Sequence, residues 1–96
     1  MQSLSLHSGA LVALCRKYHV RVLSVFGSTA RGEATEQSDI DLLVSFSQPI
    51  SLLRMAAFER ELSETLGRKV DLHTKSSLSR YLRSRILRER QQVYAA

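Results

Sequence analysis

Three aspartates have the residue type and spacing to do metal-dependent chemistry. Asp39 and Asp41 fall in the segment DIDLLVSF, whose polar–apolar alternation predicts a strand over residues 39–46. Asp71 falls in another short predicted strand, residues 70–72. Side chains two residues apart on a strand point to the same face, so Asp39 and Asp41 should lie about 6.6 Å apart along it. An adjacent strand could bring Asp71 close to both.

A cluster of this kind favours a bound divalent cation. Carboxylates held about 4 Å apart repel each other by about 4 kcal/mol at an effective dielectric constant of about 20. Hard oxygen ligands suit Mg²⁺ better than Zn²⁺, and no pair of histidines or cysteines has zinc-binding spacing. The sequence therefore predicts a magnesium site at Asp39, Asp41 and Asp71.

A glycine–serine pair precedes these aspartates. Gly27 and Ser28 follow a β-branched and aromatic segment that predicts a strand over residues 20–26, and a short helical turn is expected over residues 29–31. Glycine lets the backbone approach a phosphate closely, amides at a helix start point at anions, and the serine hydroxyl adds a donor. A phosphate site facing paired carboxylates is the arrangement that phosphoryl or nucleotidyl transfer requires.

Arg31 lies one turn beyond the glycine–serine pair and has two possible partners. It could reach the phosphates bound there, which would make it a nucleotide-binding residue. It could instead form a salt bridge with Glu33 or Glu36. The sequence does not favour either arrangement.

The hydrophobic pattern predicts the elements that position these residues. Helices are expected over about 5–19, over about 50–66, and in a last segment that begins at Ser76 or Ser77. In the last helix, Leu78, Leu82 and Ile86 should face the core and most arginines the solvent. The predicted order is α-β-(short α)-β-α-β-α. This order indicates an α/β (α+β) fold, in which a small mixed sheet packs against helices.

Composition limits the classes of protein to which the chain can belong. A length of 96 residues predicts one domain, residues 1–96, and 44% hydrophobic with 24% charged residues is typical of a globular chain rather than a disordered one. The single cysteine, Cys15, excludes an internal disulfide framework and fits a reducing compartment. No apolar run reaches the roughly 18 residues of a membrane span, and the first residues lack the pattern of a secretion signal. A cytoplasmic protein is expected.

The net charge of +5 comes from the second half of the chain. Five arginines fall within residues 80–90, and they could form a contact surface for an acidic partner or the solvated face of a helix. The predicted last helix has no aromatic residue to interleave with these arginines beyond Tyr81, so base stacking is poorly supported. Direct binding to nucleic acid is therefore not expected.

The segment GSTARGEATEQSDIDLLV, residues 27–44, resembles the signature of the minimal nucleotidyltransferases of the DNA polymerase beta superfamily. That signature has Gly-Ser, ten residues and then Asp-x-Asp, which Gly27, Ser28, Asp39 and Asp41 match. Asp71 corresponds to the third carboxylate of the family by its order and strand pattern. The resemblance also implies that the last helix ends near Tyr94.

The resemblance implies a mechanism and a partner. Asp39 and Asp41 would hold two Mg²⁺ ions, and Asp71 would share the second ion and help to remove the acceptor proton. The acceptor would attack the α-phosphate of ATP and release pyrophosphate. Relatives of this kind are typically antitoxins that pair with HEPN ribonuclease toxins and transfer AMP to a toxin tyrosine. A hetero-oligomer with a HEPN-type toxin is therefore expected.

Other functions are also possible. The fold could serve as a non-catalytic antitoxin scaffold that binds its partner, although intact Ser28, Asp39 and Asp41 argue against this. It could also be a nucleotidyltransferase that acts on another acceptor. Arg68 and His73 match the Arg-x4-His pattern of HEPN ribonucleases, but they flank a predicted strand whereas that motif lies on a helix.

Overall fold

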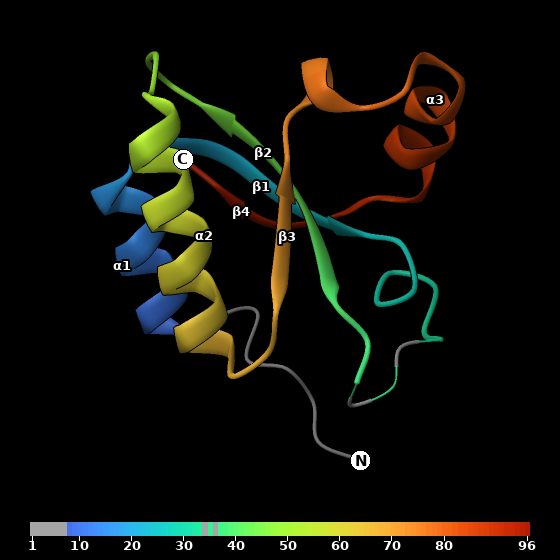
Figure 1. Ribbon diagram of the computed structural model, residues 1–96, viewed down its shortest axis with the longest axis horizontal. Helices are drawn as coiled ribbons and strands as arrows, with labels where there is room; N and C mark the ends of the chain where they lie inside the picture. Colours follow the sequence, from blue (N-terminus) through green and yellow to red (C-terminus); the bar gives the residue numbers. More distant parts are fainter. Residues whose placement is uncertain (1–7, 34, 36) are drawn as a thin grey trace.

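A four-stranded mixed sheet forms the centre of the protein in a computed structural model that describes residues 8–33, 35 and 37–96 (Figure 1). The strand order is β3-β2-β1-β4. β2 pairs in parallel with β3 and antiparallel with β1, which pairs antiparallel with β4 on its other side. The elements are α1 (Gly9–Lys17), β1 (Val20–Phe26), β2 (Ile40–Phe46), α2 (Leu52–Leu66), β3 (Val70–His73), the 3₁₀ turn η1 (Lys75–Ser77), α3 (Arg80–Glu89) and β4 (Gln91–Ala95).

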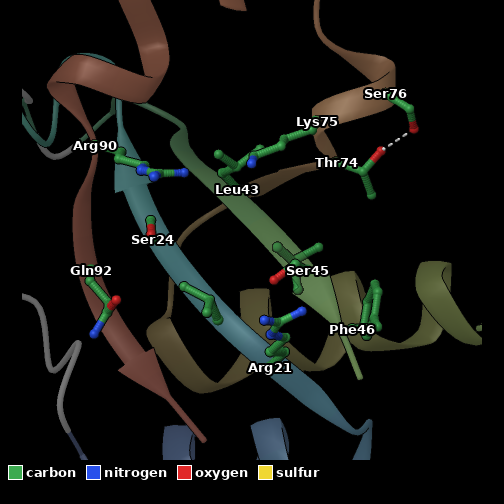
Figure 2. Close-up of a pocket in the computed structure, with 12 residues that line it drawn as sticks. Arg21, Ser24, Leu43, Ser45, Phe46, Thr74, Lys75, Ser76, Arg90 and Gln92 are labelled. Atoms are coloured by element: carbon green, nitrogen blue, oxygen red, sulfur yellow. Dashed lines mark hydrogen bonds between the residues drawn. The ribbon is translucent and has the colours of Figure 1, made fainter. Parts of the chain in front are cut away.

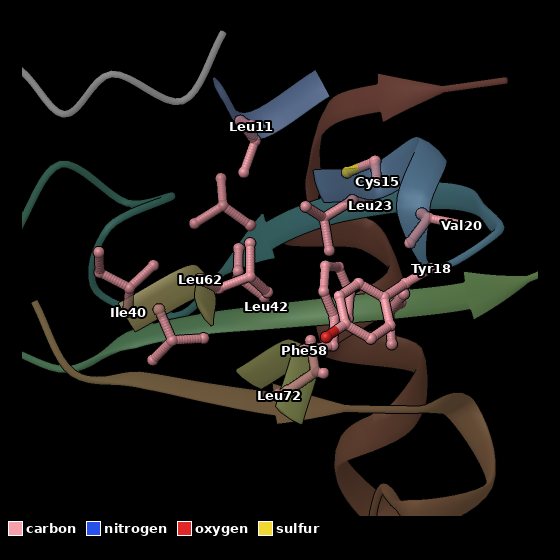
Figure 3. Packing of buried hydrophobic residues seen from close by; sticks show 13 residues of the cluster. Leu11, Cys15, Tyr18, Val20, Leu23, Ile40, Leu42, Phe58, Leu62 and Leu72 are labelled. Atoms are coloured by element: carbon pink, nitrogen blue, oxygen red, sulfur yellow. The ribbon is translucent and has the colours of Figure 1, made fainter. Parts of the chain in front are cut away.

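Helices cover both faces of this sheet. α1 and α2 lie side by side on one face, and α3 lies on the other (Figure 1). The larger hydrophobic cluster joins the sheet to α1 and α2, and Leu11, Phe58 and Leu62 in it are fully buried (Figure 3). The smaller cluster joins the sheet to α3 and contains Phe26, Leu43, Leu78 and Ile86. Alternate residues of β1 and β2 therefore face different layers, as a strand period of two requires.

The helix ends agree with local capping rules. Ser8 and Ser51 accept hydrogen bonds from backbone amides in the first turns of α1 and α2, at 3.2 and 3.1 Å. α2 therefore begins at Leu52, two residues later than expected. Gly67 ends α2 in a left-handed conformation with φ of 68°. Of the expected first helix, residues 5–7 lie outside the described part of the chain.

The end of the chain differs from the prediction. The expected helix from Ser76 or Ser77 to near Tyr94 is wrong at both ends, because α3 spans only Arg80–Glu89 and residues 91–95 form β4. Leu82 was expected in the core but is 49% exposed. The expectation placed Leu78 and Leu82 one turn apart on the same face of a helix. Leu78 instead precedes α3, so its burial does not imply that Leu82 faces the core. β4 forms because β1 offers it a free edge, which a single-sequence pattern does not reveal.

The helical turn expected over residues 29–31 forms as hydrogen-bonded turns over residues 27–32 and does not extend into a helix. The Arg31 amide donates to the Gly27 carbonyl at 3.1 Å. Gly27 and Gly32 both have φ of 73°, and these left-handed residues interrupt the helical path. Within the described residues, no helix is long and apolar enough to cross a membrane.

Candidate active site

Two of the three aspartates stand opposite each other on neighbouring strands. Asp41 of β2 is the register partner of Asp71 of β3, because the two strands run in parallel. Across the other side of β2, Phe26 is the register partner of Asp41. Asp39 lies one residue before β2 begins, where the Ile40 amide donates to the Lys69 carbonyl at 2.9 Å. The structure thus brings the predicted carboxylates to one region of the sheet.

The turn after β1 comes up against this pair. A Cβ atom placed on Gly27 would lie 2.6 Å from Oδ2 of Asp41, closer than nonbonded heavy atoms tolerate. Gly27 also has a positive φ, so two independent features favour glycine there. The turn is closed by the Glu33 amide, which donates to the Ser28 carbonyl at 2.8 Å. Within the described residues, the buried Thr29 hydroxyl in this turn has no hydrogen-bond partner.

The electrostatics of the site favour a bound cation. Burial is the largest cause that raises the pKa of Asp41 above its ordinary value, and the charges of Asp71 and Asp39 raise it further. His73 opposes this shift, because its Nε2 lies 3.7 Å from Oδ1 of Asp41. Lys69 Nζ lies at the same distance from Oδ2 of Asp39. Lys69 and His73 thus lie beside the carboxylates of Asp39 and Asp41, respectively.

The carboxylate oxygens are of the type that a hard divalent ion prefers. Their present positions do not form a metal site. Carboxylate oxygens, completed by water and phosphate oxygens, are the ligands that Mg²⁺ prefers. Within the described part of the chain, no three aspartate, glutamate, histidine or cysteine side chains converge on one metal position. Asp39 and Asp41 point instead toward Lys69 and His73. Asp39, Asp41 and Asp71 are the residues that would hold such an ion.

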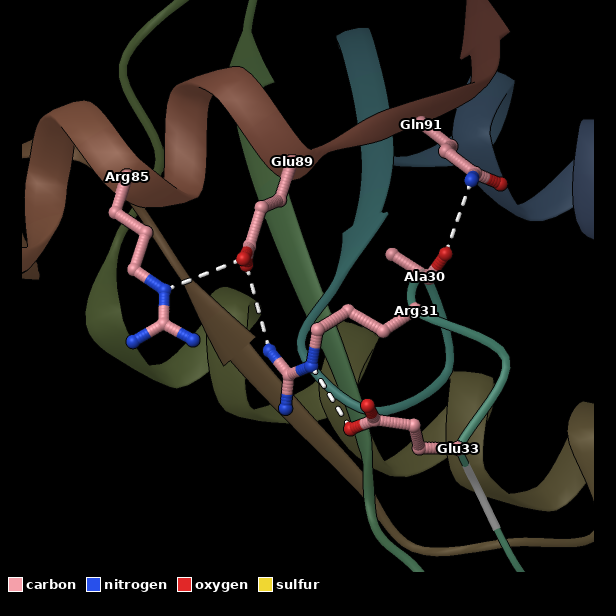
Figure 4. Close-up of polar contacts among 6 residues, drawn as sticks. All are labelled: Ala30, Arg31, Glu33, Arg85, Glu89 and Gln91. Atoms are coloured by element: carbon pink, nitrogen blue, oxygen red, sulfur yellow. Dashed lines mark hydrogen bonds and ion pairs between the residues drawn. The ribbon is translucent and has the colours of Figure 1, made fainter.

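Arg31 is engaged by two glutamates (Figure 4). Its Nε lies 3.0 Å from Oε1 of Glu33, and its Nη1 lies 3.4 Å from Oε2 of Glu89 at the end of α3. Arg85 Nε contacts the other oxygen of Glu89 at 3.2 Å. The salt bridge considered with Glu33 therefore forms, whereas Glu36 lies outside the described residues. Glu89 was not expected, because it is distant from Arg31 in the sequence.

Two residues of the discounted ribonuclease pattern have separate roles here. The guanidinium of Arg68 donates to the backbone carbonyls of Thr35 and Ser38, immediately before Asp39. His73 contacts Asp41 and meets the ring of Phe26 edge-on, with centroids 5.4 Å apart. Arg68 thus positions the loop that carries Asp39. Neither role was predicted, although His73 lies two residues after Asp71 on the same strand, which was a usable signal.

Comparisons with known proteins agree with this geometry. The nucleotidyltransferase domain family matches residues 8–93. Two Methanocaldococcus jannaschii proteins, provisionally named protein adenylyltransferases, are each 51% identical over 65 residues, which are 68% of this chain and 66% of each relative. The chain therefore matches about two thirds of the length of those relatives. Protein adenylyltransferase MntA of Thermococcus cleftensis is 46% identical over 76 residues, 79% of this chain and 77% of that protein.

Solved structures confirm the fold. One described provisionally as a minimal nucleotidyltransferase has a TM-score of 0.74 at 41% identity, covering 85% of this chain and 84% of that chain. A toxin–antitoxin complex with AMP-PNP has a TM-score of 0.75 at 22% identity, covering 91% and 72%. A Shewanella oneidensis complex of a tri-AMPylated HEPN toxin with an MNT antitoxin has 0.66 at 20% identity, covering 90% and 67%. The predicted α+β nucleotidyltransferase fold is thus confirmed.

Proposed function

Because the chain belongs to the nucleotidyltransferase domain family, we propose that it transfers AMP from Mg-ATP to a tyrosine hydroxyl of a HEPN-type ribonuclease toxin. In this proposal the chain is the antitoxin, and the modification neutralises the toxin. The observation that carries the proposal is the contact between the Gly27 turn and Asp41, beside Asp71. In this proposal the turn binds the phosphates directly beside the paired carboxylates.

The relatives support the substrate and the partner. Relatives with up to 51% identity are named protein adenylyltransferases, which fits AMP as the transferred group. Structures with the same fold include a complex with AMP-PNP and a complex with an AMPylated HEPN toxin. A HEPN-type toxin would then supply the acceptor hydroxyl, and the two proteins would form a hetero-oligomer.

In the proposed reaction, each group of the site has one task. The backbone of Gly27 and the hydroxyl of Ser28 bind the phosphates. Asp39, Asp41 and Asp71 would hold Mg²⁺, which supplies charge neutralisation at the phosphates and lowers the pKa of the attacking hydroxyl. The Asp71 carboxylate takes the proton of that hydroxyl. The acceptor oxygen then bonds to the α-phosphorus as the bond to pyrophosphate breaks.

The transfer assay tests this proposal. The purified chain is incubated with a HEPN toxin and ATP labelled at the α-phosphate, with Mg²⁺ or with EDTA, and tyrosine-linked AMP is detected by mass spectrometry. We expect label on the toxin with Mg²⁺ only, and loss of toxin ribonuclease activity in parallel. Asp41→Asn and Asp71→Asn should abolish transfer, whereas Glu64→Gln, at an exposed carboxylate of α2, should not.

Two other results would replace the proposal. If the toxin is neutralised equally without ATP, or by Asp41→Asn, the chain acts as a binding scaffold rather than an enzyme. If the label appears on another residue or on another molecule, the nucleotidyltransferase assignment stands and the tyrosine acceptor is wrong.

A further inference from the structure

A hollow lies over the sheet, lined by residues of β1, β2, η1 and β4 (Figure 2). This sheet pocket has a volume of about 680 Å³ and lies between the strands, η1 and the start of β4. Its polar lining consists of Arg21, Ser24, Ser45, Thr74, Lys75, Ser76, Arg90 and Gln92. None of the nucleotide-site residues described above belongs to it.

The strand register places the pocket relative to the carboxylates. Asp41, Leu43 and Ser45 occupy successive positions on one face of β2, at steps of about 7 Å. The register partner of Leu43 on β1 is Ser24, two residues before Phe26, the partner of Asp41. The pocket therefore begins one step from Asp41, on the side away from the Gly27 turn. Because α3 packs on Phe26 and Leu43, it stands between the two sites.

The charges around the pocket are all of one sign. Arg21, Lys75 and Arg90 line it, and none of the aspartates and glutamates that the structure describes does. In the described part of the chain, none of these three forms an ion pair, whereas Lys17 and Arg85 each contact a glutamate. Three cations gathered around one hollow repel one another, and a bound anion relieves that repulsion.

A buried hydroxyl adds hydrogen-bonding capacity at the floor of the pocket. Ser24 is only 2% exposed. Among the described residues, it is the one polar or charged residue in the buried class. Its hydroxyl lines the pocket, where it can donate a hydrogen bond to a ligand or accept one from it. Thr74 and Ser76, which bond each other at 3.1 Å, lie at the rim with further hydroxyls (Figure 2).

We propose that the sheet pocket binds an acidic segment of the protein that receives the nucleotide, an inference that rests on the proposed function. The hollow is much larger than a single anion needs, and hydroxyls with the Gln92 amide suit the backbone of a peptide. Nucleic acid is disfavoured, because Phe46, the lining aromatic, packs its ring against Phe58 with centroids 6.0 Å apart. A partner bound there lies on the face of the sheet to which Asp41 belongs.

The test uses hexaglutamate peptide as the probe and the full chain labelled with ¹⁵N. We expect the amides of Ser24, Ser45 and Thr74 to shift during the titration, and the affinity to fall as salt is added. The triple variant Arg21→Ala, Lys75→Ala, Arg90→Ala should bind the peptide about tenfold more weakly. The matched control removes the same charge from the exposed face of α3, through Arg80→Ala, Arg83→Ala and Arg88→Ala, and should keep the affinity within about twofold.

Several outcomes would overturn the proposal. Equal losses in both triple variants would reduce the effect to net charge, and shifts confined to α3 would place the peptide elsewhere. Inorganic phosphate that shifts the same amides as strongly would make the pocket a simple anion site. A single-stranded oligonucleotide that displaces the peptide would make it a nucleic-acid site. A parallel fall in ATP affinity in the pocket variant would assign the pocket to the nucleotide.

Catalysis separates this proposal from the proposed function. The pocket variant should raise the KM for the acceptor protein and leave the KM for ATP unchanged, whereas an unchanged acceptor KM would overturn the acceptor assignment. If the wild-type chain transfers no AMP but still binds the peptide in the pocket, the proposed function fails and the peptide site stands.

Discussion

Replacing Gly27 with alanine should separate stability from activity. Gly27 has φ of 73°, and the added Cβ would lie 2.6 Å from Oδ2 of Asp41. The atom in the way is the end of a flexible side chain, so the carboxylate can move aside. The variant should therefore fold with Asp41 displaced from its position beside Asp71.

The expected magnitudes follow from these two effects. A left-handed conformation costs a residue with a Cβ about 1–2 kcal/mol, which for a chain of this size lowers the melting temperature by about 4–16 °C. Displacing a reacting group by about 1 Å can lower the rate by about 10²-fold. The loss of transfer should therefore be far larger than the loss of stability explains.

Two other glycines provide matched controls. Gly32 and Gly67 have φ of 73° and 68°, but a Cβ on either would meet nothing within 4 Å. Gly32→Ala and Gly67→Ala should lower the melting temperature about as much as Gly27→Ala while they retain transfer. Thermal melts and labelled-ATP transfer are measured on all three variants. Wild-type transfer by Gly27→Ala, or an equal loss in the Gly67 control, would refute the role given to this contact.

Three further predictions concern groups around the site and in the core. Glu89→Gln removes one of the charges that hold Arg31, so ATP affinity should rise about two- to fivefold by calorimetry if Arg31 binds phosphate; unchanged affinity would leave Arg31 with its salt bridges alone. Arg68→Ala should loosen the loop before Asp39 and lower both transfer and the melting temperature, by about 1–3 kcal/mol in stability, and unchanged values would deny it a positioning role. Burial raises the pKa of the Cys15 thiol from 9.0 to about 11, so iodoacetamide at pH 8 should react much faster with the chain unfolded in urea than with the folded chain. The same shift means that stability is retained below pH 9 and declines as pH rises toward 11, which melts across that range would show.

Elements with a local pattern could be predicted from the sequence. The β-branched run of β1 and the alternation through β2 depend on neighbouring residues, and both strands form close to the expected bounds. The sequence raised the possibility that an adjacent strand brings Asp71 close to Asp41, and β2 and β3 do pair in that register. The bounds of the two strands needed no knowledge of contacts between distant parts of the chain.

Contacts between distant segments could not be predicted in this way. β4 is a strand because it pairs with β1, and residues 91–95 have no alternation strong enough to indicate one alone. Arg31 and Glu89 meet only because β4 returns the chain from α3 to the edge of the sheet. When the last helix is predicted to extend to Tyr94, β4 is missing from the predicted fold, and the contact between Arg31 and Glu89 cannot be inferred.

Residues 91–95, which were predicted as helix and form β4, determine the surroundings of both candidate sites. With β4 paired to β1, α3 lies over Phe26 and Leu43, and its end reaches the Gly27 turn through Glu89 and Arg31. Arg90, between α3 and β4, then lines the sheet pocket on the other side of the helix. The signature residues of the site can therefore be recognised locally. What separates the nucleotide site from the sheet pocket depends on one non-local strand pair, so a substitution in β4 at a position outside the pocket lining, such as Val93, should affect both sites.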